Sequence, residues 1–170
     1  MRFCEINEIA EWFRTHGIDA DVSTWAARLQ DLQYRYRTSF ASGRKSGREP
    51  GIVRRAVAAL PDWSEALLRV TLWGVWPSGE DWPRYYRARE AHDERRSLET
   101  APGHLFAPED ISQLRLFLTL AMENGWDADV SFADGNGKLS THILVSHDEW
   151  LEIHTNEPLA PNPLSGRADR

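Results

Sequence analysis

The chain has one cysteine, Cys4, among its 170 residues. A single thiol forms no internal disulfide, no thiol-based zinc site and no redox pair, so a reducing compartment fits best. No apolar run is long enough to cross a bilayer, and the N-terminal stretch MRFCEINEIAEWF carries glutamates where a signal peptide needs an unbroken apolar segment. We therefore expect a cytoplasmic protein that does not associate with membranes.

Common catalytic and metal-binding patterns are also missing. Gly43-Arg44-Lys45 fits no P-loop, because that loop needs Gly-Lys followed by Ser or Thr after a strand. His147 and Glu149 resemble the His-x-Glu of zinc deaminases, but the cysteine ligands of that site are absent. We predict no catalytic residue, no metal site and no cofactor. The sequence favours a non-enzymatic role, and an enzyme would need several histidines to converge in a pocket: His104, His142, His147 or His154.

Aromatic side chains, in contrast, are abundant, and four tryptophans and two tyrosines fall between Trp63 and Tyr86. Aromatic residues concentrate burial energy in cores and in interface hot spots, and we expect most of this run to be core. Helix and strand periodicity cannot bury every ring, so one or two rings are expected at the surface beside arginines. Trp76, Trp82 and Arg89 are therefore candidate partner-binding residues.

Apolar periodicity predicts five helices and several strands. The helices are expected at 5–16, 21–40 and 52–60, after Ser78, and at 108–124. Residues 68–72 alternate as a strand, with a helix over 66–73 as the rival reading, so the state of 66–76 is left open. The tetrapeptide from Asp134 to Gly137 predicts a hairpin within 127–145, and a last strand follows near 150–153. Residues 42–51 are predicted to form a loop, and residues 91–104 to be irregular.

These elements predict one α+β domain over residues 1–157. We expect an antiparallel sheet of three to four strands, packed against N-terminal helices and the 108–124 helix. Residues 158–170 hold three prolines in their first six positions and little apolar content, which is typical of a disordered tail.

Charge is unevenly placed along the chain. Residues 1–60 hold ten lysines and arginines against seven acids, whereas residues 61–170 hold ten against nineteen. Between Asp127 and Glu157 one base, Lys138, faces seven acids. An acidic surface of this kind repels nucleic acid and attracts a basic protein. Asp148, Glu149 and Glu152 are therefore the acidic candidates for partner binding.

The basic segment 35–55 supports an alternative. Arg44, Lys45 and Arg48 could bind phosphate groups of a nucleic acid or a nucleotide through charge. A solvated basic loop is the simpler reading, because the glycines in this segment match no phosphate-binding fingerprint.

Four short motifs occur in a characteristic order: WGVWPS at 73–78, YYRAR at 85–89, APGHLF at 101–106 and SHDEW at 146–150. In this order the chain resembles a family of small uncharacterised bacterial proteins, over residues 34–153. Small, acidic bacterial proteins without enzyme motifs resemble the immunity proteins of toxin systems, which is an analogy of type. The analogy and the acidic surface together predict a protein-interaction protein whose partner is basic, with a toxin as one such partner, and leave the partner's identity and the oligomeric state open.

Overall fold

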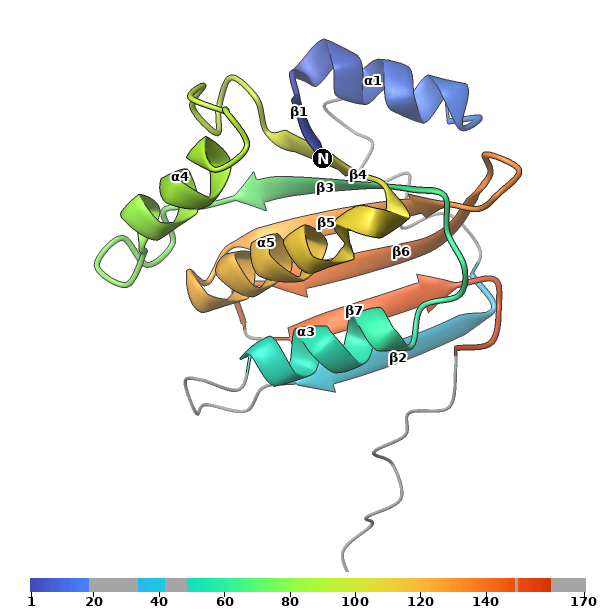
Figure 1. Cartoon of the computed structure of the whole chain (residues 1–170). Helices are drawn as coiled ribbons and strands as arrows, with labels where there is room; N and C mark the ends of the chain where they lie inside the picture. Colours follow the sequence, from blue (N-terminus) through green and yellow to red (C-terminus); the bar gives the residue numbers. More distant parts are fainter. Residues whose placement is uncertain (19–33, 42–48, 149, 160–170) are drawn as a thin grey trace, which may run out of the picture.

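The structure is a computed structural model that describes residues 1–18, 34–41, 49–148 and 150–159. In this part of the chain one antiparallel sheet of seven strands is accompanied by four α-helices (Figure 1). The strands lie side by side in the order β1-β4-β3-β5-β6-β7-β2. Their bounds are β1 Arg2–Cys4, β2 Tyr36–Ala41, β3 Glu65–Leu72, β4 Gly103–Phe106, β5 Asp127–Ala133, β6 Leu139–Ser146 and β7 Trp150–Thr155.

The prediction of three to four strands is wrong, because β1, β2 and β4 were not recognised as strands. β1 and β4 have three and four residues, which is too short for an alternating pattern to be read. The predicted helix over 21–40 includes the residues of β2, since Tyr36 and Phe40 are four residues apart. The same two residues also fit the period of a strand, and both pair with β7. The rest of that predicted helix, 21–33, lies outside the described residues.

The helices are α1 Ile6–Thr15, α3 Glu49–Ala58, α4 Trp82–Glu90 and α5 Ile111–Glu123, with a 3₁₀ turn η1 at Pro108–Asp110 before α5. All four match predicted helices. α3 begins earlier than expected, inside the predicted loop, and the rest of that loop, 42–48, is not described. α4 is capped by Asp81, whose side chain accepts a hydrogen bond from the backbone N–H of Arg84, and not by Ser78.

The two faces of the sheet differ in polarity. On one, called the helix face, Leu68, Val130, Ile143 and Ile153 lie in register and pack in a large apolar core that includes residues of α3 and α5. Because side chains alternate along a strand, the intervening residues point to the other side. There Arg69, Asp129, His142 and Glu152 form what we call the polar face, while α1 covers its β1–β4–β3 end (Figure 1).

α1 approaches the sheet closely. Ile9 and Phe13 join a second apolar cluster with Leu67 and Ala133. A Cβ added to Gly103 would lie 2.8 Å from Cγ1 of Ile9, so only glycine allows the helix this near to β4. The first helix therefore closes one end of the polar face, and the helix face supplies most of the core.

Candidate functional site

Two of the predicted partner-binding residues, Trp76 and Asp148, lie at one end of the sheet, which we call the acidic end. In the antiparallel register Leu72, the last residue of β3, opposes Asp127, the first of β5, and Ser146 opposes Trp150. The loop after β3 and the turn between β6 and β7 therefore lie at the same end. These two connections carry Trp76 and Asp148, respectively.

Trp76 is the most exposed large apolar side chain in the described residues, at 59%. Its indole lies over Gly125, where a Cβ would be only 2.9 Å from Cδ1 of Trp76. Gly125 also has a positive φ of 62°, which ends α5 and turns the chain into β5. The glycine thus holds the ring against the backbone while the other side of the ring meets solvent.

A pocket of about 180 Å³ opens at the same end of the sheet. Its walls are Thr71, Asp127, Ala128, Asp129, Leu144, Val145, Ser146 and Trp150. Asp129 is only 3% exposed and forms an ion pair of 2.9 Å with Arg69, but its Oδ1 accepts no hydrogen bond. Two carboxylates beside an indole give this pocket the chemistry to receive a cationic side chain.

A histidine fixes the orientation of one of these acids. Asp127 accepts hydrogen bonds from the backbone N–H of His147 (2.7 Å) and pairs with Nδ1 of the same residue (2.8 Å). The hydrogen bond to Asp127 raises the pKa of His147 above its usual value, although slight burial opposes this. Asp148 is 73% exposed, 3.8 Å from Nε2 of His147, and keeps most of its carboxylate in solvent.

Other predicted partner-binding residues lie elsewhere. Trp82 is half-buried and packs on Trp126, with ring centroids 4.7 Å apart. Glu152 is 9% exposed on the polar face, where Arg37 binds both of its carboxylate oxygens and Ser39 donates a further hydrogen bond. Glu149 lies outside the described residues.

Arg89 is fully buried, so it does not reach a partner. Its guanidinium donates to Tyr85 Oη (3.0 Å) and to the carbonyls of Ala101 and Arg96. Nδ1 of His104 lies 3.1 Å from the Pro102 carbonyl. A carbonyl oxygen can only accept a hydrogen bond, so Nδ1 carries the proton and donates it. Nε2 of the neutral ring therefore accepts a hydrogen bond from the Tyr85 hydroxyl, at 2.8 Å.

This inner network carries a single positive charge. Burial, followed by the nearby charge of Arg89, lowers the pKa of His104 to about 3, so the imidazole is neutral. Burial likewise raises the pKa of Tyr85. The motifs YYRAR and APGHLF therefore meet in the core, where they join α4 to β4.

The histidines that an enzyme would need do not converge. His104 lies on the helix face and His147 at the acidic end, whereas His142 and His154 are cross-strand neighbours on the polar face. His142 contacts Ser131 Oγ through Nδ1 (3.1 Å), and burial lowers its pKa to about 4. Neither residue lines a described pocket.

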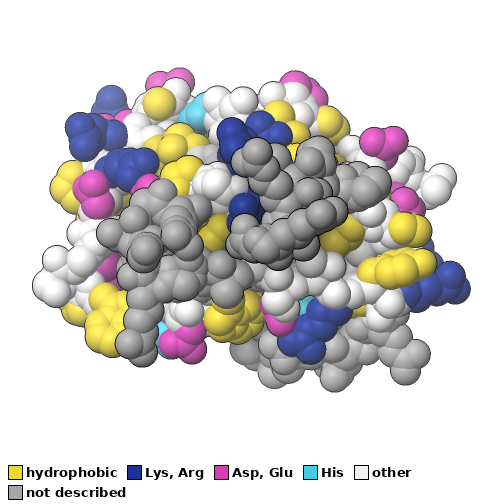
Figure 2. All heavy atoms as spheres, turned by 90° about the horizontal axis from the view of Figure 1, so that it is seen from below, with side chains coloured by type: hydrophobic (Ala, Val, Ile, Leu, Met, Phe, Trp, Pro, Cys, Tyr) yellow, Lys and Arg dark blue, Asp and Glu magenta, His cyan; other side chains and the backbone are white. Residues whose placement is uncertain are grey.

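The basic candidates Arg44, Lys45 and Arg48 lie outside the described residues, so nothing here places them. Figure 2 shows the molecule from the side of β2 and α3. In the part that is described, acidic and basic side chains are interspersed on this side. The described residues form no continuous basic surface in this view.

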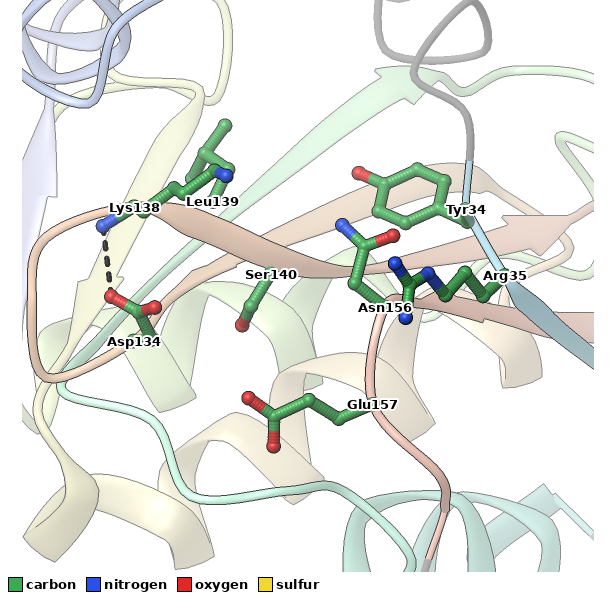
Figure 3. A pocket seen from close by; sticks show the side chains of 8 residues that line it. All are labelled: Tyr34, Arg35, Asp134, Lys138, Leu139, Ser140, Asn156 and Glu157. Carbon is green, nitrogen blue, oxygen red and sulfur yellow. Dashed lines mark hydrogen bonds between the residues drawn. The ribbon is translucent and has the colours of Figure 1, made fainter.

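A larger pocket of about 690 Å³ lies at the opposite end of the sheet, beside the β5–β6 hairpin (Figure 3). Its walls are Tyr34, Arg35, Asp134, Lys138, Leu139, Ser140, Asn156 and Glu157. They come from the residues just before β2, from the hairpin with the start of β6, and from the residues just after β7. Sequence reasoning missed this site, since no local pattern connects three segments so far apart in the chain.

Two kinds of feature are absent from the described residues. No helix there has the length and apolar character needed to span a membrane, and no three metal-ligating side chains gather as a metal site would require. No protein-family model, curated protein or solved structure matches the chain. The resemblance to the small bacterial family therefore stays a prediction.

Proposed function

We propose that this protein is a protein-interaction protein that binds a basic partner at the acidic end of its sheet. The observation that carries the proposal is that the exposed Trp76 lies at the same end of the sheet as a pocket lined by Asp127, Asp129 and Trp150. A toxin neutralised by an immunity protein is one partner of this kind, and the charge of the chain agrees with it.

The two parts of this surface would act differently. Exposed acids such as Asp148 would speed the encounter with a basic protein and make it sensitive to salt. An arginine or lysine of the partner would then enter the pocket, where Asp129 Oδ1 has no hydrogen bond of its own. Trp76 would supply the apolar anchor, as tryptophan does at many interface hot spots.

Competing charges at this end are few. Arg69 already pairs with Asp129, and His147 with Asp127. Asp148 has only a long contact with His147, so its charge is largely available to a partner. The acidic end thus keeps a local excess of negative charge.

The test is capture of the partner by tagged protein from a lysate of the host, at two salt concentrations, with quantitative mass spectrometry. We expect one basic protein at near-equal amount. Asp148→Lys should reduce its retention at low salt at least several-fold, and Trp76→Ser should reduce it at both salt concentrations. Loss of a hot-spot side chain costs about 2 kcal/mol or more, or about thirtyfold in affinity.

Matched control variants lie away from the acidic end. Asp62 is exposed in the loop before β3, and Leu116 is a partly exposed apolar residue of α5. Asp62→Lys and Leu116→Ser should leave retention unchanged. If all four variants retained the partner equally, or if the retained protein were acidic, the proposed surface would be wrong.

A further inference from the structure

The pocket beside the β5–β6 hairpin has the size of a small-molecule site. Its volume of about 690 Å³ is within the usual range of about 300–1,000 Å³ for ligand pockets and far exceeds the space a single ion needs. Figure 3 shows Tyr34 and Arg35 on one wall, Asp134 and Lys138 on the opposite wall, and Ser140 between them.

Most polar groups of this pocket are free to bind a ligand. In the described part of the chain, the charged ends of Arg35, Lys138 and Glu157 take part in no ion pair or hydrogen bond. Ser140 is only 7% exposed, and its hydroxyl has no hydrogen-bond partner. A buried hydroxyl left in this way is unfavourable, and a ligand that bonds to it removes the penalty.

Asp134 is the exception. Its Oδ1 accepts the backbone N–H groups of Asn136 (2.8 Å) and Lys138 (3.0 Å), the second of which is the dashed line in Figure 3. These bonds stabilise the hairpin turn and occupy Oδ1. The pocket is therefore lined by two cations, Arg35 and Lys138, and by two acids, of which Asp134 is held by the turn and Glu157 is free for a ligand.

The hydrogen-bonding groups favour an anion attached to a hydroxylated ring. A guanidinium and an ammonium suit the oxygens of a phosphate group. Glu157 and Asn156 can accept hydrogen bonds from hydroxyls, and Ser140 can both accept and donate. The Tyr34 ring is oriented by an edge contact with His154, at 5.8 Å between centroids, and offers an aromatic surface.

We propose that this pocket binds a small phosphate ester of a hydroxylated ring, either a free sugar phosphate or the sugar phosphate of a nucleotide. The site is separate from the acidic end and does not depend on the proposed interaction function. Arg35 belongs to the basic segment 35–55, so the earlier phosphate-binding alternative gains a defined place for one of its residues.

Isothermal titration calorimetry with the full chain tests the proposal with four probes: ribose 5-phosphate, adenosine monophosphate, ribose and inorganic phosphate. We expect ribose 5-phosphate to bind at least about tenfold more tightly than ribose or phosphate. If adenosine monophosphate binds as tightly as ribose 5-phosphate, the sugar phosphate is the part that the pocket recognises. If adenosine monophosphate binds more tightly, the pocket also recognises the base, and the ligand is a nucleotide. Both results support the proposal.

Variants connect binding to these residues. Arg35→Gln and Lys138→Gln should each weaken binding about tenfold, as expected for the loss of a charge-assisted hydrogen bond. Arg95→Gln is the matched control, because Arg95 is exposed after α4, beyond the β1 edge of the sheet. Ser140→Ala should weaken binding several-fold without lowering the urea midpoint, which separates a binding role from a structural one.

Three results would overturn the proposal. One is that neither ribose 5-phosphate nor adenosine monophosphate binds with a dissociation constant below about 10 mM. Another is binding of inorganic phosphate as tightly as the esters. The third is unchanged affinity in both Arg35→Gln and Lys138→Gln.

Discussion

Replacing Arg89 by lysine should destabilise the protein more than replacing it by methionine. Arg89 is completely buried, and its guanidinium serves Tyr85, Arg96 and Ala101 at once. The nearest ring is Phe3, with Cζ of Arg89 4.5 Å from its centroid. No described carboxylate forms an ion pair with the guanidinium, so carbonyls, a hydroxyl and a ring contact this charge, and Glu94 acts on it only at longer range.

The magnitudes differ for the two variants. Methionine removes the charge and leaves mainly the buried carbonyl of Ala101 without a donor, which costs about 1–3 kcal/mol. Lysine keeps the charge in the core, but its single nitrogen cannot reach Tyr85, Arg96 and Ala101 together. A buried charge that loses its partners costs about 3–5 kcal/mol. We therefore expect Arg89→Lys to be about 2 kcal/mol less stable than Arg89→Met.

Urea unfolding, followed by tryptophan fluorescence, measures this difference. With a slope of about 2 kcal/mol per molar urea, the two midpoints should differ by about 1 M. Arg87 lies on the exposed side of the same helix, so Arg87→Lys and Arg87→Met should change stability by less than about 0.5 kcal/mol. If Arg89→Lys were as stable as the natural protein, or more stable than Arg89→Met, the reasoning would be refuted.

Three further predictions concern pH and the acidic end. The pKa of His142 is about 4 in the folded protein and near 6.5 in the unfolded chain, so the unfolded chain binds a proton more readily and acid destabilises the fold. The natural protein should therefore lose about 2 kcal/mol of stability between pH 7 and pH 5 through this residue. Urea unfolding at the two pH values should show that His142→Gln does not suffer this loss. The hydrogen bond to Asp127 raises the pKa of His147, so their ion pair stabilises the folded protein fully below about pH 6.5 and is lost as the pH rises through the raised pKa. His147→Gln should therefore lower the melting temperature more at pH 5.5 than at pH 9. Gly125→Ala should cost about 1–2 kcal/mol in urea unfolding and move Trp76, with a change in tryptophan emission, because its φ is positive and its Cβ would meet the indole.

Local patterns predicted the longer elements well. Regular apolar spacing was sufficient for α1 and α5, and the turn sequence from Asp134 to Gly137 was sufficient for the β5–β6 hairpin. β1 and β4 could not be predicted in this way. Their few residues become strands because neighbouring strands supply hydrogen-bond partners, and such pairing is not recorded in a local pattern.

The candidate site was predicted in part for a similar reason. Trp76 and Asp148 were both identified from the sequence, but only the register of β3, β5 and β6 brings their loops to one end of the sheet. Arg89 was misassigned, because arginine is rarely buried and its acceptors come from a distant segment, 96–101. The pocket with Ser140 has no sequence signal at all.

The distribution of polar groups explains how one small sheet could carry two sites. The helix face supplies the apolar burial that stabilises the fold, so substitutions of its residues lower the stability of the protein. On the polar face, pairs such as Arg69 with Asp129 and Arg37 with Glu152 satisfy one another across strands. Two of the buried atoms without a hydrogen-bond partner in the described residues, Asp129 Oδ1 and Ser140 Oγ, each line a pocket, one toward each end of this face. At these two places a ligand or a partner that supplies the missing hydrogen bond gains binding energy.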